Sequence, residues 1–381
     1  MAEILTRNCN NKPVAKNRSP YKDYYVSEIR FRKLNQKGDN IDMKRTLNIA
    51  LSVLSLAGIF AQPLQAGIAT PSALFTIELK AGNNFISTPF ARSEEDTGTI
   101  VSQLNTVLTV DSLTDTSYRT NEFQLVAGAE PYILEILDGP WIGYTTTIES
   151  NSSTTITLPG NAPTNLQGCK YAIRKDWTVE SLFGAAASSL LTGTDWFGGD
   201  EESADEIRLM SDTGSLGPVY LKGTIDGAGT QQWINQAMQN VSKTRLPFGK
   251  GIFVKAKSDK TITLSGIVRG SRTRIDIVGG KKINLLANPV PFAVKLQDCG
   301  LEITRGSAVS NADNLRLWNG TGWTSYWLDL GRVWRAGSNL TSDAGNTVIP
   351  AGAGFLVKRG SNRGDLKGEN ALKFAAFTVA P

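Results

Sequence analysis

Three short blocks occur twice in this chain, in the same order, and this repetition restricts how the chain can fold. The recurring pairs are LPFGKGIFVK (246–255) with IPAGAGFLVK (349–358), ADEIRL (204–209) with ADNLRL (312–317), and NFISTP (84–89) with NLLANP (284–289). Self-similarity of this kind indicates two related structural modules. Pro89 and Asp205 are 116 residues apart, whereas Pro289 and Asp313 are only 24 apart. The first copy therefore carries an insertion of about 90 residues, the size of a small domain, at about residues 91–176.

The repeated blocks have the alternating apolar pattern and the glycine-marked turns of β-strands. The segment NLRLWNGTGWTSYWLDL (314–330) predicts a hairpin that turns at Asn319–Gly322. Helix is expected only briefly, in TVESLFGAAASSLL (178–191) and in TQQWINQAMQNV (230–241). The predicted fold is mostly β, with two related β-sandwich-like or barrel-like modules at 67–268 and 273–381. The first module carries the β-rich insertion domain.

The segment MKRTLNIALSVLSLAGIFAQPLQA (43–66) has the basic start, apolar run and small-residue end of a secretory signal peptide. We expect cleavage near Ala66 and export to the periplasm, the outer cell surface or the extracellular space. The apolar run of about 14 residues is shorter than the roughly 20 that span a membrane, so no transmembrane segment is expected in the mature chain. Residues 1–42 are polar and basic, and we interpret them as translated upstream sequence or a disordered tail, with Met43 as the true start.

The charge of the mature part argues against nucleic acid as a partner. The chain has 40 Lys and Arg and 35 Asp and Glu, but residues 1–66 hold 11 of the cations and 5 of the anions. The remaining 29 cations and 30 anions leave nothing to neutralise phosphates in bulk. The chain has no histidine. This excludes Ser-His-Asp and Cys-His nucleophile systems and removes the commonest zinc ligand.

Two small groups of residues could have a structural or metal-binding role. Cys169 and Cys299 could form a disulfide in an oxidising compartment, or remain two separate buried thiols. The run GGDEESADE supplies Asp200, Glu201 and Glu202, and calcium takes oxygen ligands in such loops. The spacing matches no EF-hand, so a solvated acidic loop is the alternative. No other cofactor is predicted.

The repeated loops and acids have simple structural interpretations. The Pro-x-Gly-x-Gly loops lead into strands rather than helices, so we interpret them as turns that use glycine at positive φ rather than as phosphate-binding loops. Asp205 and Asp313 occupy the same place before a strand in each copy. We expect each to make an Asx turn at the strand entry.

Aromatic residues are concentrated in the second module, where Trp318, Trp323, Tyr326, Trp327 and Trp334 fall within 17 residues. Some must form the core, and the match to the first copy places Trp327 there. Exposed rings suit the faces of sugars. Trp318 is the first candidate for ligand binding because the first copy has Met210 there. Trp323 is the second because it begins the return strand beside the glycine turn.

Three segments carry a resemblance to a known group of proteins. YAIRKDWTVESLFG (171–184), AGNNFISTPF (81–90) and LPFGKGIFVK, together with the signal peptide, resemble a family of uncharacterised exported bacterial β-rich proteins. The NLLANP block also resembles the Gly-Trp-Asn-Leu-Ile-Gly-Asn-Pro segment of many secreted β modules. The resemblance implies export and a β-rich body, and implies no activity.

These features favour an exported, non-enzymatic β protein of the cell envelope or extracellular space, with a structural or adhesive role. The first alternative is a carbohydrate-binding protein that uses exposed tryptophans to hold a polysaccharide or another cell-surface component. The second alternative is a polysaccharide-acting enzyme that uses paired carboxylates, as glycoside hydrolases do.

Overall fold

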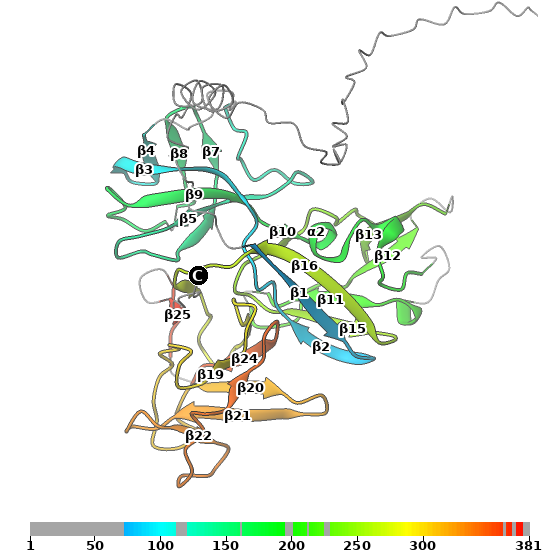
Figure 1. Ribbon diagram of the computed structural model, residues 1–381, viewed down its shortest axis with the longest axis vertical. Coiled ribbons are helices and arrows are strands. Elements are labelled where there is room, and N and C mark those ends of the chain that lie inside the picture. Colours follow the sequence, from blue (N-terminus) through cyan, green and yellow to red (C-terminus); the bar gives the residue numbers. More distant parts are fainter. Residues whose placement is uncertain are drawn as a thin grey trace, which may run out of the picture. The chain divides into compact units, whose positions relative to one another are not determined.

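The computed structural model describes most of the chain from residue 72 onward. The described ranges are 72–111, 120–160, 162–194, 201–211, 213–224, 229–360, 363–367 and 371–375. The predicted signal peptide and the segment before it lie outside these ranges. The part of the chain from Ile68 onward forms one compact unit. Its described residues are mostly β, as the sequence predicts, and are arranged in several antiparallel sheets (Figure 1).

Each module contains a five-stranded antiparallel sheet, and the two sheets have corresponding strand orders. The first has the order β13-β12-β11-β15-β2, with β2 (Gly82–Ile86), β11 (Glu206–Leu209), β12 (Tyr220–Thr224), β13 (Gln231–Asn235) and β15 (Ile252–Ala256). The second has the order β18-β24-β20-β21-β22, with β18 (Ile283–Ala287), β20 (Asn314–Trp318), β21 (Trp323–Leu328), β22 (Trp334–Ala336) and β24 (Gly354–Lys358). The predicted hairpin at Asn319–Gly322 is confirmed by the β20–β21 pairing.

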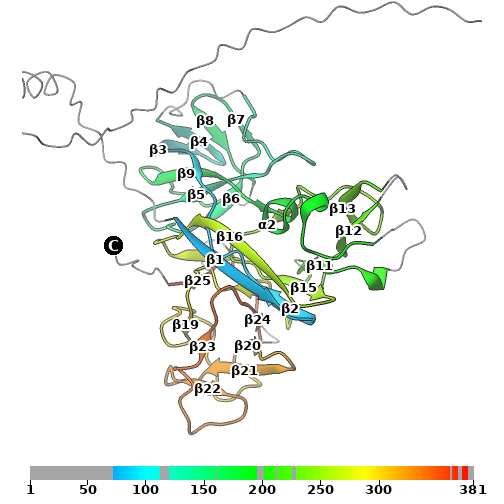
Figure 2. The same cartoon turned by 45° about the vertical axis from the view of Figure 1, so that its right-hand side comes forward.

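Two short ribbons accompany each sheet. In the first module these are β1 (Ser72–Leu79) with β16 (Lys260–Ile267), and β10 (Trp177–Thr178) with β14 (Arg245–Leu246). In the second they are β17 (Thr273–Ile275) with β25 (Leu372–Phe374), and β19 (Val294–Lys295) with β23 (Val348–Ile349). The β1–β16 ribbon is the longest of them, and its two strands run side by side in both views (Figures 1 and 2).

The registers of the two modules also correspond. Ile207 lies opposite Val254 in the first sheet, and Leu315 lies opposite Val357 in the second. These are the positions that the repeated blocks align. The correspondence supports the duplication that the sequence predicts, which stays a prediction until the two backbones are superposed.

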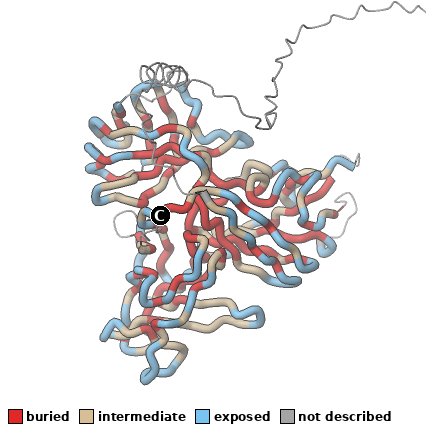
Figure 3. The backbone as a smooth tube through the Cα atoms, viewed as in Figure 1, coloured by how far each residue is buried: buried red, intermediate tan, exposed pale blue. Residues whose placement is uncertain are grey.

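Each module has its own apolar core beneath these sheets. In the first, Leu79 and Ile262 of the β1–β16 ribbon are buried with Ile207 and Val254 of the five-stranded sheet. Apolar side chains on facing layers exclude water from both, which is sandwich-like packing. Figure 3 shows the burial concentrated along the strands and the exposed positions concentrated at the turns.

The insertion forms a seven-stranded antiparallel sheet with a separate core. Its strand order is β6-β5-β9-β3-β4-β8-β7. The strands are β3 (Glu94–Leu104), β4 (Val107–Val110), β5 (Tyr132–Ile136), β6 (Thr145–Thr147), β7 (Ser150–Asn151), β8 (Thr155–Thr157) and β9 (Lys170–Lys175). Ile100, Leu108, Leu134 and Tyr171 are buried together between its strands.

Helix is scarcer among the described residues than the sequence suggests. The first expected segment forms α2 (Val179–Phe183), which starts at a capping box between Thr178 and Ser181, and a 3-10 turn at Ala186–Ser188. A second 3-10 turn covers Glu201–Ser203. The expectation of helix at 230–241 is wrong, because β13 occupies Gln231–Asn235. Pairing with β12 buries Trp233, and this packing outweighs the local helix propensity.

The Pro-x-Gly-x-Gly loops join the two modules to each other. Ala287 N–H donates to Gly249 O at 2.9 Å, and Ser87 N–H donates to Gly352 O at 2.9 Å. The loop of the first module therefore pairs with the end of β18 in the second, and the loop of the second module pairs with the end of β2 in the first. Gly249 and Gly352 have φ of 79° and 67°, which confirms the expected need for glycine at positive φ.

Candidate functional site

The two tryptophans predicted to bind ligand lie at the junction of the modules. Trp318 and Trp323 face each other across the β20–β21 hairpin, with ring centres 5.2 Å apart. Phe85 of β2, in the first module, approaches Trp323 to 4.5 Å and Trp318 to 5.6 Å. Trp327, in contrast, is fully buried and donates its indole N–H to Gly337 O at 2.8 Å. Trp327 is therefore a core residue, as expected.

Trp318 lines a cavity of about 450 Å³, which we call cavity A. The other lining residues come from β1, β2, the β20–β21 turn and the loop at 351–353, and include Phe75, Asn83 and Phe85. Trp323 is not among them, because it packs on Phe85 beside Phe253 and Leu285. The structure therefore separates the two predicted residues into one that lines a cavity and one that packs the junction.

The polar groups around cavity A are of two kinds. The indole N–H of Trp318 and the side-chain amide of Asn83 have no hydrogen-bond partner within the described part of the chain. Glu78 and Lys80, in contrast, form an ion pair at 3.7 Å, and Lys80 also contacts Asp259 at 3.2 Å. The cation along this edge is therefore paired with two acids, while two neutral donors remain available.

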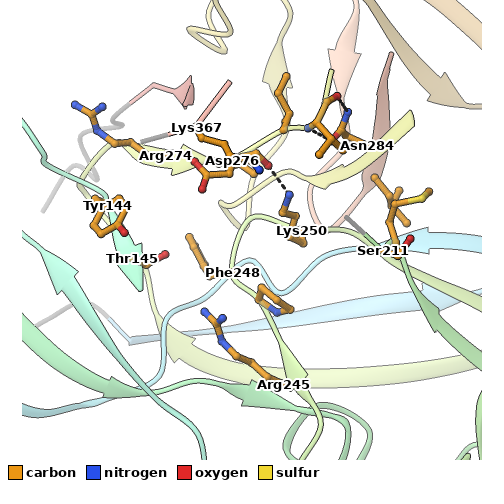
Figure 4. A pocket seen from close by; sticks show the side chains of 16 residues that line it. Tyr144, Thr145, Ser211, Arg245, Phe248, Lys250, Arg274, Asp276, Asn284 and Lys367 are labelled. Carbon is orange, nitrogen blue, oxygen red and sulfur yellow. Dashed lines mark hydrogen bonds between the residues drawn. The ribbon is translucent and has the colours of Figure 1, made fainter. Parts of the chain in front are cut away.

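A second cavity, cavity B, has a volume of about 360 Å³ and lies where both modules meet the insertion (Figure 4). Its lining includes Arg245, Lys250, Arg274 and Lys367, but Asp276 as its single acid. Lys250 Nζ donates to the main-chain oxygen of Asp276, and the Arg274 guanidinium donates to Ile142 O and Pro140 O of the insertion. Tyr144 and Thr145 of the insertion complete the wall.

The two cavities occupy corresponding places in the two modules. Met210 stands three residues after Ile207 in β11, and Trp318 stands three residues after Leu315 in β20. Met210 lines cavity B and Trp318 lines cavity A. At two further corresponding positions cavity B has Leu285 and Lys250, and cavity A has Phe85 and Ala353. At a third corresponding position cavity B has Phe248 and cavity A has Ala351, so the two cavities differ mainly by the Trp318–Phe85 pair in one and the cations in the other.

The two repeated aspartates do not make local Asx turns, so that expectation is wrong. Both are fully buried. Asp205 accepts hydrogen bonds from the main-chain N–H of Thr192 and of Lys257, at 2.5 and 2.6 Å. Asp313 accepts from Thr304 and Gly360, both at 3.0 Å. Each carboxylate therefore holds two distant chain segments together, because buried amide groups need acceptors.

The predicted calcium ligands lie largely outside the described part of the chain, so the calcium site stays a prediction. Asp200 lies outside that part, and the exposed Glu202 lies in the 3-10 turn at Glu201–Ser203. Within the described ranges no group of three or more Asp, Glu or Cys side chains is arranged to hold a metal ion.

The cysteines are two separate buried thiols, so the disulfide alternative is not realised. Cys169 belongs to the core of the insertion, and Cys299 belongs to the core of the second module. Their burial in different cores keeps the sulfurs out of reach of each other. Burial raises the pKa of the Cys299 thiol to about 12, so it is protonated and unreactive at neutral pH.

A buried ionic network ties the insertion to the chain between the modules. Glu135 of β5, with only 2% of its side chain exposed, pairs with Arg174 at 2.7 Å and with Arg269 of the intermodule segment. Arg174 also reaches Glu94 at 2.6 Å. Burial alone would raise the pKa of Glu135. The charges of Arg269 and Arg174 and the hydrogen bonds from both outweigh burial and hold this pKa below its usual range.

Sequence reasoning missed both this network and most of cavity A. Phe75, Asn83 and Phe85 meet Trp318 only because the two modules pair, and no local pattern encodes that pairing. Phe85 does lie within the repeated NFISTP block, opposite Leu285 of the second copy, and this difference between the copies is a signal that could have drawn attention to it.

No protein-family model, curated protein or solved structure matches the chain. Among the described residues, no helix is both long and apolar enough to span a membrane.

Proposed function

We propose that this chain is an exported, non-enzymatic β protein of the cell envelope or extracellular space, with a structural or adhesive role. The observation that carries the proposal is the reciprocal pairing of the modules. Main-chain hydrogen bonds at Ser87–Gly352 and Ala287–Gly249 hold them at two places. Two such attachments resist hinge motion, which suits a protein that serves as a scaffold or transmits load.

The attachment of the insertion supports the same role. The Glu135–Arg174–Arg269 network fixes the insertion to the segment between the modules, and the side chains of all three residues are at most 6% exposed. Removing either partner of a buried pair is costly, so the network holds one arrangement of these parts. A chain built in this way presents its surfaces at fixed relative positions.

Carbohydrate binding is the second candidate function. Cavity A favours it, because the half-buried Trp318 lines a space that also contains Phe75, Phe85 and unpaired polar groups. The carboxylate-based enzyme has less support, because Asp205 and Asp313 are fully buried and both oxygens of each accept main-chain hydrogen bonds.

Export is tested by expressing the chain from Met43 in a bacterium, with a tag after Pro381. We expect the tagged protein in the periplasm, at the cell surface or in the medium, with a new amino terminus directly after Ala66. N-terminal sequencing of the fractionated protein measures this. Uncleaved protein confined to the cytoplasm, or recovery of residues 1–42 from the native host, would contradict the proposal.

Adhesion is tested with beads coated with residues 67–381, which include the compact unit that begins at Ile68. The beads should bind intact cells or envelope fragments of the native host, while beads coated with the denatured chain should not. Incubation with polysaccharides should release no reducing ends. Saccharide release would favour the enzyme alternative instead.

A further inference from the structure

We propose that cavity A binds one neutral pyranose residue of a glycan, in a site that requires both modules. The inference rests on the carbohydrate-binding candidate above and specifies its site and ligand class. Phe75, Asn83 and Phe85 come from the first module, and Trp318 comes from the second. The pairing of the modules is therefore what assembles the site.

The size and the wall of cavity A suit a small ligand. Its volume of about 450 Å³ lies in the range of roughly 300–1,000 Å³ that is usual for small-molecule sites, which favour boundaries between domains. Phe75, Phe85 and Trp318 give it aromatic surface, and all three are only partly buried. The C–H face of a pyranose ring is apolar and can pack on such rings, while its edge carries hydroxyl groups.

The polar groups at cavity A suit those hydroxyls. The Trp318 indole N–H can donate one hydrogen bond, and the Asn83 amide can both donate and accept. Within the described residues neither group bonds another part of the chain, so a sugar would have to displace only water. Each bond formed would also discriminate against a ligand that lacks the hydroxyl.

The charge balance at cavity A selects a neutral sugar. Glu78 and Lys80 pair there, and Asp259 shares the same Lys80, so no unpaired cation awaits an acidic group. Cavity B is lined by four cations and one acid, and two of these cations are paired outside the lining, Arg245 with Asp176 and Lys367 with Asp365. The lining of cavity B remains the more positive of the two, so an acidic glycan would favour it over cavity A.

The difference between corresponding positions supports a specialised role for cavity A. A tryptophan that only completed the shared architecture would be expected in both modules, yet Met210, directly after β11, stands where β20 has Trp318. Leu285 stands where β2 has Phe85. The contact between Phe85 and Trp318 is thus a property of one junction, and the other junction, which has Phe248 and Tyr144, folds without a tryptophan.

The test uses residues 67–381 and an array of neutral and acidic glycans. Titration of tryptophan fluorescence with cellohexaose, maltohexaose and chitohexaose follows. We expect binding to at least one neutral glycan, with blue-shifted emission as Trp318 is covered. Trp318→Ala should weaken that binding at least tenfold.

Two further variants separate binding from folding. Asn83→Ala removes an exposed side chain and should weaken binding about threefold or more without changing the melting temperature. Met210→Ala makes the matched change at cavity B and should leave the affinity within about twofold of the wild type. If Trp318→Ala alters the far-UV spectrum, Asn83→Ala decides the question.

Several results would overturn the inference. These are binding of acidic glycans alone, equal loss in the Met210 and Trp318 variants, unchanged affinity in both Trp318→Ala and Asn83→Ala, or no neutral glycan bound at all. If coated beads still adhere to cells when no neutral glycan binds, the adhesive function stands and only the assignment of cavity A falls.

Discussion

Replacing Glu135 with glutamine should destabilise the protein strongly, although the change is nearly isosteric. The side chains of Glu135 and Arg269 are only 2% and 3% exposed, and Arg269 has no other ion-pair partner among the described residues. Arg174 would still have an ion-pair partner in the variant, because it also contacts Glu94 at 2.6 Å. The substitution therefore leaves one buried guanidinium without a counter-charge, which costs about 3–5 kcal/mol of unfolding free energy. That is a large fraction of the roughly 5–15 kcal/mol typical of a folded protein.

Urea denaturation followed by tryptophan fluorescence measures this loss. The matched control is Glu94→Gln, which alters the partly exposed end of the same network and should cost less than about 1 kcal/mol. Replacing Glu135 by Leu together with Arg174 and Arg269 by Met should restore much of the stability, because no charge is then left buried. A Glu135→Gln variant within 1 kcal/mol of the wild type would refute the reasoning.

Three further predictions follow from the same structure. The folded-state pKa of Glu135 lies below its unfolded value, so the carboxylate contributes fully to the free energy of unfolding above the unfolded pKa. This contribution is lost as pH falls through the folded pKa. The difference in unfolding free energy between the wild type and Glu135→Gln, measured by urea denaturation, should therefore narrow in acid. Gly251→Ala should lower the free energy of unfolding by about 1–3 kcal/mol, because a Cβ there would lie 2.6 Å from Leu286 O. In the control variant Gly364→Ala the added Cβ meets nothing within 4 Å, so its thermal melting temperature should be nearly unchanged. Cys169 and Cys299 should resist a thiol reagent until the chain is unfolded; rapid labelling of the native protein would contradict their burial.

The sequence predicts the local elements of this fold well. Alternating apolar residues and the turn at Asn319–Gly322 predict the β20–β21 hairpin, and the repeated blocks align positions that have the same pairing register in both sheets. The local pattern fails at 230–241, where a polar segment around Trp233 reads as helix. Pairing with β12 decides the structure there, and that contact is not local.

The candidate site could be predicted only in part, for the same reason. The contrast between Met210 and Trp318 singles out the tryptophan that lines cavity A. The sequence match between the copies aligns Tyr220-Leu221 with Trp327-Leu328. In the structure, Tyr220 pairs with Ile207 and Tyr326 pairs with the corresponding Leu315, so Tyr220 corresponds to Tyr326 and the sequence alignment is one residue off. Phe75 and Phe85 reach the site through main-chain pairing between modules. Such pairing carries no side-chain signature, since its donors and acceptors are backbone groups.

A crystal structure of residues 67–381 with a bound neutral hexasaccharide would test the central claim most directly. We predict sugar density in cavity A, with one pyranose ring packed on Trp318 and a hydroxyl within hydrogen-bond distance of the Asn83 amide. Cavity B should hold no sugar in the same crystal. Density for a glycan that binds in solution but lies away from Trp318, at cavity B or on the insertion, would contradict the account.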